Sequence, residues 1–120
     1  MKNILIVDDD KEMTMILGDI LETHHYGVTF AYDGLQAFEK TQKEKVDLIL
    51  LDICMPYFTG FWFCDAFKNK PQTRHIPIVM MSGMPDEENR ERALNLGAVA
   101  FLKKPFNPSE LLKILKNTLD

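Results

Sequence analysis

The sequence predicts an α/β fold in which five β-α units build a doubly wound, five-stranded parallel sheet. Five short apolar runs punctuate the chain, at residues 3–7, 28–31, 47–51, 78–81 and 98–102. Most of them are continuous rather than alternating, which is typical of strands covered on both faces. Amphipathic stretches of helical length lie between the runs. Strands that alternate with helices imply a parallel sheet with right-handed crossovers.

Apolar side chains at helical spacing support the first and last helices. They repeat every three or four residues, which places them on one face of a helix. The first stripe consists of Met13, Ile16, Leu17, Ile20 and Leu21, and the last consists of Leu111, Leu112, Leu115 and Leu119. Each of these helices can therefore bury one stripe against the sheet.

Capping residues mark where further helices begin. Asp33, with Gln36 three residues later, resembles a capping box. Asn107 supplies a cap that is followed by Pro108 at the first helical position. The three acids at residues 86–88 favour another helix start, because the helix dipole attracts negative charge there.

Two glycines mark predicted helix ends. Gly27 and Gly97 stand where C-terminal caps belong, since glycine adopts the left-handed conformation without strain. His24 and His25 are adjacent and do not face one another on a helix, so we interpret them as residues that favour the helix C-terminus rather than as metal ligands.

Length and composition indicate one globular domain over residues 1–120. The chain has 46% hydrophobic and 27% charged residues, which is ordinary for a folded domain. We find no internal repeat, linker or second domain, and the sequence ends with the fifth helix, which leaves no room for an effector domain. The net charge of −4 has no clustered basic excess, so direct nucleic-acid binding is not expected.

Compartment signals are consistent with a cytoplasmic protein. The two cysteines, Cys54 and Cys64, form neither a disulfide framework nor a CxxC pair, so we expect a reducing compartment. The longest uncharged run, residues 53–64, is far shorter than the ~20 apolar residues that span a bilayer. The N-terminus reaches three acids after four apolar residues, unlike a signal peptide.

Charged and polar side chains follow four of the five predicted strands. In chain order they are Asp8, Asp9 and Asp10, then Asp52, then Ser82, and finally Lys103 and Lys104 before Pro105. Ligands of open parallel sheets bind at the carboxyl ends of the strands, so these side chains are expected to meet at one edge. We assign Asp10 to the cap of the first helix and Lys103 to solvent.

The chemistry of this edge points to phosphoryl transfer. Asp8, Asp9 and Asp52 would repel one another, and a divalent cation that prefers oxygen ligands, such as Mg²⁺, relieves that repulsion. A lysine is a compact positive charge that suits a phosphoryl oxygen. Carboxylates, a cation, a lysine and a hydroxyl together describe transfer of a phosphoryl group to a carboxylate.

Four motifs in order carry a resemblance to a known family. The sequence resembles the receiver domain of two-component response regulators, and in particular the single-domain chemotaxis-type regulators. The motifs are IVDDD at residues 6–10, LLDICMP at 50–56, MMSG at 80–83 and FLKKPF at 101–106. The resemblance covers essentially the whole chain and implies the flavodoxin-like strand order 2-1-3-4-5.

The resemblance implies a role for each residue of the acidic edge. Asp52 would be the phosphoacceptor, attacking a phosphohistidine on a partner. Mg²⁺, or another divalent cation such as Mn²⁺, would be bound directly by Asp9 and Asp52, mainly through water by Asp8, and by the backbone carbonyl of Cys54.

The resemblance also implies a switch. The Ser82 hydroxyl and the Lys104 ammonium would contact the phosphoryl group, and the bond before Pro105 would be cis. Phe101 would rotate inward when Ser82 moves, although its alternative interpretation is an ordinary core residue. The surface formed by the fourth helix, fifth strand and fifth helix would then change.

The expected partners follow from this switch. They are a sensor histidine kinase or histidine phosphotransfer protein and a downstream protein target or output domain, with a phosphorylation-dependent homodimer as a further possibility. No membrane partner is expected. On this interpretation the domain is not an enzyme in its own right and catalyses only its own phosphorylation and dephosphorylation.

Two features of the sequence depart from the ordinary pattern. Cys54 and Met84 occupy positions where an acid or amide would orient an attacking water, so we hypothesise slow self-dephosphorylation. Aromatic residues are dense between residues 57 and 67. A helix that begins near Thr59 would bury Phe63, Cys64 and Phe67, place Phe61 at its margin and point Trp62 outward. The aromatic cluster of Tyr57, Phe58, Phe61 and Trp62 is either a partner surface or partly buried against neighbouring side chains.

Three other classes of function are weighed against this one. A phosphatase of the haloacid-dehalogenase type needs an acid two residues after its nucleophile, where this chain has Cys54. A flavodoxin-like cofactor binder needs a phosphate-cradling loop after the first strand, where this chain has three aspartates. A receiver-shaped module that works without phosphorylation remains an alternative that the intact acid set disfavours.

Overall fold

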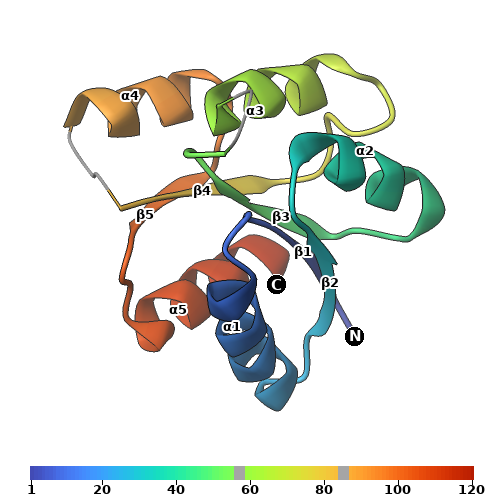
Figure 1. Ribbon diagram of the computed structural model, residues 1–120, viewed down its shortest axis with the longest axis vertical. Coiled ribbons are helices and arrows are strands. Elements are labelled where there is room, and N and C mark those ends of the chain that lie inside the picture. Colours follow the sequence, from blue (N-terminus) through green and yellow to red (C-terminus); the bar gives the residue numbers. More distant parts are fainter. Residues whose placement is uncertain (56–58, 84–86) are drawn as a thin grey trace.

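A parallel sheet forms the centre of the protein, and its strand order is the predicted one. The computed structural model describes residues 1–55, 59–83 and 87–120. Its five strands lie in the order β2-β1-β3-β4-β5 (Figure 1). They are β1 (Asn3–Val7), β2 (Gly27–Ala31), β3 (Leu48–Asp52), β4 (Ile78–Ser82) and β5 (Ala100–Lys103).

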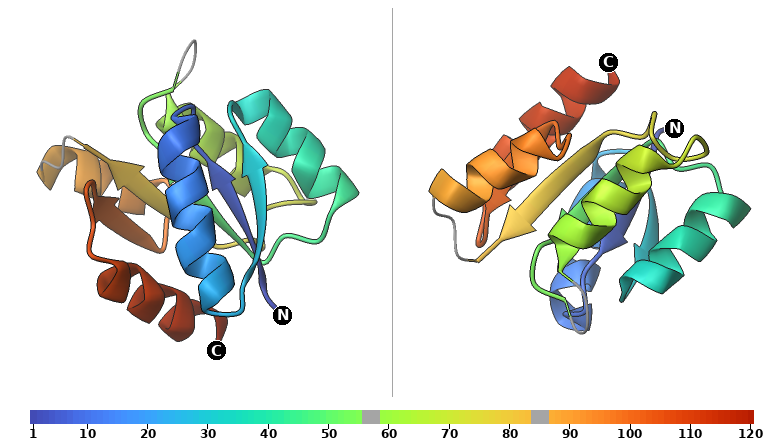
Figure 2. Two further views of the ribbon diagram at one scale, coloured as in Figure 1. Left: turned by 60° about the horizontal axis from the view of Figure 1, so that its bottom comes forward. Right: turned by 90° about the horizontal axis from the view of Figure 1, so that it is seen from above.

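Helices cover both faces of this sheet, as continuous apolar strands require. They are α1 (Lys11–Thr23), α2 (Gly34–Lys43), α3 (Gly60–Asn69), α4 (Glu87–Asn95) and α5 (Pro108–Leu119). α1 and α5 pack on one face, and α2, α3 and α4 pack on the other (Figures 1 and 2). Two hydrophobic cores result, one on each side of the sheet. Within the described ranges, no helix has the length and apolar character needed to cross a membrane.

Three of the predicted helix starts are capped by side chains, and Asp86, predicted at the start of a fourth helix, lies outside the described residues. Asp10 caps α1 by accepting a hydrogen bond from the backbone N–H three residues on, and Asp33 caps α2 in the same way. The Gln36 side chain accepts from the N–H of Tyr32 rather than from that of the cap itself. Asn107 caps α5, which begins with a proline. Local sequence therefore fixes where these helices begin.

The prediction that Gly27 caps α1 is wrong. Gly27 is the first residue of β2 and pairs with Asn3 of β1. The left-handed residue that closes α1 is His25, with φ of 69°, and the N–H of Tyr26 returns to the carbonyl of Leu21 at 3.1 Å. The helix thus ends two residues earlier than the glycine suggested, and a histidine carries the strained conformation.

The C-terminal cap of α4 explains why β5 begins later than predicted. Gly97, with φ of 105°, closes α4 as expected. The N–H of Ala98 then bonds to the carbonyl of Ala93 at 3.1 Å, so residue 98 belongs to the helix cap and β5 begins only at Ala100. The remaining strand boundaries lie within one residue of the prediction.

Helix α3 buries its aromatic residues more deeply than predicted. Its expected buried residues, Phe63, Cys64 and Phe67, are all in the core, and Trp62 points outward with 52% of its surface exposed. Phe61 is also buried rather than marginal, because α4 covers it and the Arg92 guanidinium stacks 4.3 Å from its ring centroid. Tyr57 and Phe58 lie outside the described residues.

Candidate functional site

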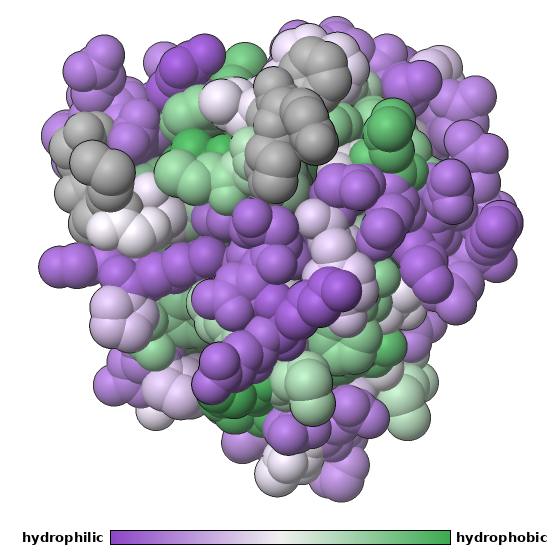
Figure 3. Space-filling view, viewed as in Figure 1, coloured by the Kyte–Doolittle hydropathy of each residue, from purple (hydrophilic) through white to green (hydrophobic). Residues whose placement is uncertain are grey.

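The parallel register brings the predicted acids together. β1 pairs Val7 with Leu51 of β3, so Asp8 and Asp52, the next residues along, end up side by side at the carboxyl edge of the sheet. Ser82 ends the neighbouring strand β4. Figure 3 shows hydrophilic residues gathered across the middle of this face. The strands therefore place acids and a hydroxyl at one edge.

Lys104 connects the two buried acids. Its Nζ lies 2.5 Å from Asp8 Oδ2 and 3.2 Å from Asp52 Oδ1. The Lys104 N–H donates to the carbonyl of Ser82 at 2.7 Å, which holds the start of the β5–α5 loop beside β4. The peptide bond between Lys104 and Pro105 is cis. Lys103, by contrast, is exposed, as the sequence predicted.

Burial dominates the electrostatics of Asp52. Desolvation and the neighbouring Asp8 raise the pKa of Asp52 from 3.8 to about 6, against the opposing effects of Lys104 and the backbone N–H of Cys54. Burial also works to lower the pKa of Lys104, but Asp8 and Asp52 outweigh it and the net pKa is raised. Near neutral pH the site therefore holds closely spaced charges that one ammonium only partly balances.

The acidic group fits a hard divalent cation. One carboxylate oxygen from each of Asp8, Asp9 and Asp52 can lie within 4.8 Å of the other two. An octahedral ion with oxygen ligands at about 2.1 Å places opposite ligands roughly 4.2 Å apart, so small adjustments would let all three reach one Mg²⁺. Asp8 and Asp52 are buried and Asp9 is exposed, which leaves the open side to water.

Two backbone contacts at the site were not predicted. The N–H of Asp10 donates to Asp8 Oδ1 at 3.0 Å and so orients that carboxylate. Gly60 packs against Asp52, and a Cβ on Gly60 would stand 2.2 Å from the Asp52 carbonyl oxygen. The available signal was a glycine eight residues after the end of β3, but a close backbone approach cannot be inferred from one glycine.

The residues assigned to the switch lie on β4 and β5. Ser82 is buried at the end of β4, at the same edge as Asp52. Phe101 pairs with Met80 across the β4–β5 ladder and is 8% exposed, within the core beneath α2, α3 and α4. Cys54 is exposed beside the site. Met84 lies outside the described residues.

Comparisons with known proteins agree on one family. A family model described as "Response regulator receiver domain" matches residues 4–116. The chain is 39% identical over 119 residues to the transcriptional regulatory protein CpxR of Escherichia coli, covering 99% of this chain and 50% of CpxR. It is 38% identical over 104 residues to the response regulator PleD of Caulobacter vibrioides, covering 87% of this chain and 23% of PleD.

Solved structures extend the likeness to three dimensions. The Vibrio cholerae chemotaxis protein CheY4 matches with a TM-score of 0.91 and 36% identity, covering 98% of each chain. A two-component response regulator from Clostridium difficile matches with a TM-score of 0.92 and 32% identity, covering 99% of this chain and 96% of its own. The chain spans about half the length of the CpxR sequences that it matches.

Proposed function

Because the chain belongs to the family of response regulator receiver domains, we propose that it is a phosphorylation-operated switch whose phosphoacceptor is Asp52. The observation that carries this proposal is the bridge from Lys104 Nζ to Asp8 and Asp52, at 2.5 and 3.2 Å. It keeps a cation within reach of any phosphoryl group added to Asp52.

In the proposed reaction, Asp52 is the nucleophile. A carboxylate oxygen attacks the phosphorus of a phosphohistidine, the P–N bond breaks, and its electron pair leaves with the imidazole. Lys104 pairs with a phosphoryl oxygen, and the Ser82 hydroxyl donates to another. A Mg²⁺ or Mn²⁺ ion bound by Asp8, Asp9, Asp52 and the carbonyl of Cys54 would neutralise the charge that gathers between acids and phosphoryl oxygens.

In the proposed switch, phosphorylation at the carboxyl edge of the sheet changes the conformation of an outer surface. Movement of Ser82 toward the phosphoryl group would open space beside β5, into which Phe101 rotates, and the surface of α4, β5 and α5 would change. Conversion from a mostly inactive to a mostly active population requires about 5.5 kcal/mol of differential stabilisation. The new contacts of Ser82 and Lys104, with the bound cation, are the proposed source of that energy.

Partners and location follow from the same proposal. The phosphoryl donor would be a sensor histidine kinase or a histidine phosphotransfer protein, and the receiver of the signal a downstream protein or an attached output domain. The protein would act in the cytoplasm, could form a phosphorylation-dependent homodimer, and would catalyse only its own phosphorylation and dephosphorylation. Direct contact with nucleic acid or membrane is not part of the proposal.

An intact-mass experiment tests the proposal. The protein is incubated with Mg²⁺ and a small-molecule phosphodonor, alongside an Asp52→Ala variant and a metal-free sample. We expect the native chain with Mg²⁺ to gain the mass of one phosphoryl group. The Asp52→Ala variant and the metal-free sample should gain none. Modification of the Asp52→Ala variant to the same extent would reject Asp52 as the acceptor. Repeating the experiment with a phosphorylated histidine kinase in place of the small-molecule donor would test the proposed class of partner.

A further inference from the structure

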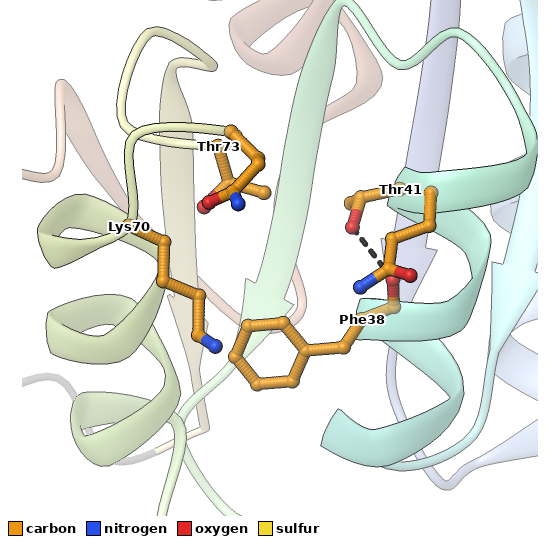
Figure 4. Close-up of a pocket in the computed structure, with 6 residues that line it drawn as sticks. Phe38, Thr41, Lys70 and Thr73 are labelled. Carbon is orange, nitrogen blue, oxygen red and sulfur yellow. Dashed lines mark hydrogen bonds between the residues drawn. The ribbon is translucent and has the colours of Figure 1, made fainter.

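A cavity lies at the end of the molecule opposite the acidic edge. Helices α2 and α3 run from the carboxyl edge of the sheet back to its amino edge, so their last turns lie far from Asp52. Between the end of α2 and the segment that follows α3 is a cavity of about 440 Å³ (Figure 4). Its lining comprises Phe38, Thr41, Gln42, Lys70, Gln72 and Thr73. None of these residues belongs to the acidic site.

An aromatic ring forms one wall of this cavity. Phe38 is only partly buried, and its ring centroid lies 4.3 Å from that of Phe67 and 6.0 Å from that of Phe63. Both of those rings belong to the core under α3. Phe38 is thus held from behind while it presents apolar surface to the cavity, which suits a flat apolar group.

A lysine supplies the charge. The Nζ of Lys70 lies 5.2 Å from the Phe38 ring centroid, and Figure 4 shows the two side chains facing one another. In the part of the chain that the structure describes, no carboxylate oxygen comes within 4 Å of this ammonium. Residues 66–85 contain two lysines, one arginine and one histidine but no acid. Of these, Lys68 already donates to two backbone carbonyls. Among the described residues that line the cavity, Lys70 is the one cation, so its ammonium is the charge that a ligand would meet.

Two threonine hydroxyls determine part of the hydrogen-bonding capacity of the cavity. The Thr41 hydroxyl donates to the carbonyl of Phe38 at 2.7 Å, and the Thr73 hydroxyl donates to that of Phe67 at 2.6 Å. Each hydroxyl has only one hydrogen, so only its oxygen lone pairs remain to accept. The amides of Gln42 and Gln72 can both donate and accept. A ligand here would meet one cation, several acceptors and two adaptable amides.

From these contacts we propose that the cavity binds a small aromatic carboxylate. The carboxylate would pair with the Lys70 ammonium, and the ring would lie against Phe38. The volume falls within the roughly 300–1,000 Å³ of known small-molecule sites. An inorganic anion would leave the Phe38 wall unused, and a neutral ring would leave Lys70 without its counter-ion. This site does not depend on the phosphorylation proposal.

Amide-resolved NMR tests the site. The ¹⁵N-labelled native chain is titrated separately with benzoate, with benzamide, which is similar in shape but neutral, and with acetate, which lacks the ring. We expect benzoate to shift the amide signals of residues 38–42 and of Lys70, Gln72 and Thr73 with a dissociation constant on the order of millimolar, as befits a ligand of this size. Benzamide and acetate should bind several times more weakly.

Matched variants complete the test. Lys70→Gln should weaken benzoate binding about fivefold, the scale of a partly exposed ion pair. Lys113→Gln, an exposed lysine on α5, should leave it unchanged. The proposal is overturned if benzoate shifts no amide signals at residues 38–42, Lys70, Gln72 or Thr73. It is equally overturned if benzamide or acetate binds as well as benzoate, or if Lys70→Gln has no effect.

Discussion

Gly60, at the start of α3, lies directly against the backbone of Asp52. A Cβ at Gly60 would stand 2.2 Å from the Asp52 carbonyl oxygen and 2.8 Å from the Cα of Ile53, closer than such atoms approach. The N–H of Gly60 also donates to the carbonyl of Ile53 at 2.7 Å. The first turn of α3 is thereby fixed to the strand end that carries the proposed phosphoacceptor.

This contact predicts that Gly60→Ala destabilises the protein. The added methyl group meets backbone rather than a flexible side chain, so strand and helix must move apart, at a cost of about 1–3 kcal/mol. Urea unfolding measures the loss. Gly83→Ala is the matched control, because a Cβ there meets nothing within 4 Å. Equal stability of the two variants would contradict the packing described.

The raised pKa of Asp52 predicts how stability depends on pH. The folded state holds this proton up to about pH 6, whereas the unfolded chain releases it near 3.8. The ionised group therefore costs stability progressively as pH rises from 4 to 6, reaching about 3 kcal/mol above that range. In metal-free buffer, Asp52→Asn should be more stable than the native chain at pH 7 and should lose that advantage at pH 3.5. Chemical unfolding at several pH values measures it, and a constant difference would refute the prediction.

A divalent cation should offset the same cost. Mg²⁺ at one hundred times its dissociation constant should raise the free energy of unfolding by about 2.7 kcal/mol, because it binds only the folded site. Thermal unfolding with Mg²⁺ and with a chelator measures the shift. Asp9→Asn removes the exposed member of the acidic group and should abolish most of it. A shift that survives in Asp9→Asn would place the cation elsewhere.

Lys104 should stabilise the metal-free protein while opposing the cation. Lys104→Met leaves Asp8 and Asp52 facing one another, which should cost about 3 kcal/mol at pH 8. The cost should be smaller at pH 5, where protonation of Asp52 relieves the repulsion. The same variant should bind Mg²⁺ more tightly, since no ammonium competes for the Asp8 oxygen. Calorimetric titration measures the affinity, with the exposed Lys103→Met as control.

The sequence predicted the fold and the acidic edge well because both rest on strong local patterns. Short continuous apolar runs that alternate with amphipathic helices favour buried parallel strands. Parallel pairing of β1 with β3 then brings Asp8 and Asp52 to one edge of the sheet. The errors lie where tertiary contacts override a local preference. His25 adopts the left-handed conformation that was expected at Gly27. Phe61 is buried because α4 packs over it and places Arg92 against its ring.

The cavity beside Phe38 could not be predicted at all. Its residues come from two segments roughly thirty positions apart, and neither segment contains a motif. A lysine after a helix normally indicates a solvated end. Only the packed structure shows that Lys70 faces an aromatic ring across a hollow, with no carboxylate within 4 Å among the described residues.

Cys54 predicts a long-lived phosphorylated state. It lies two residues after Asp52, is exposed, and its backbone N–H donates a hydrogen bond to the Asp52 carboxylate. A thiol neither orients water nor accepts its proton as a carboxylate does, so hydrolysis of the acyl phosphate should be slow. Cys54→Glu supplies that missing group and should shorten the lifetime at least about tenfold, a modest share of what general bases contribute.

The decay of phosphorylated protein measures this lifetime once the phosphodonor has been removed. Cys64→Ala is a poor control because Cys64 is buried, whereas Cys54→Ser keeps the size and exposure of the side chain and adds no base. We expect Cys54→Ser to decay much as the native chain does. If Cys54→Glu decays no faster than Cys54→Ser, access of water rather than its activation sets the lifetime, and this account of Cys54 fails.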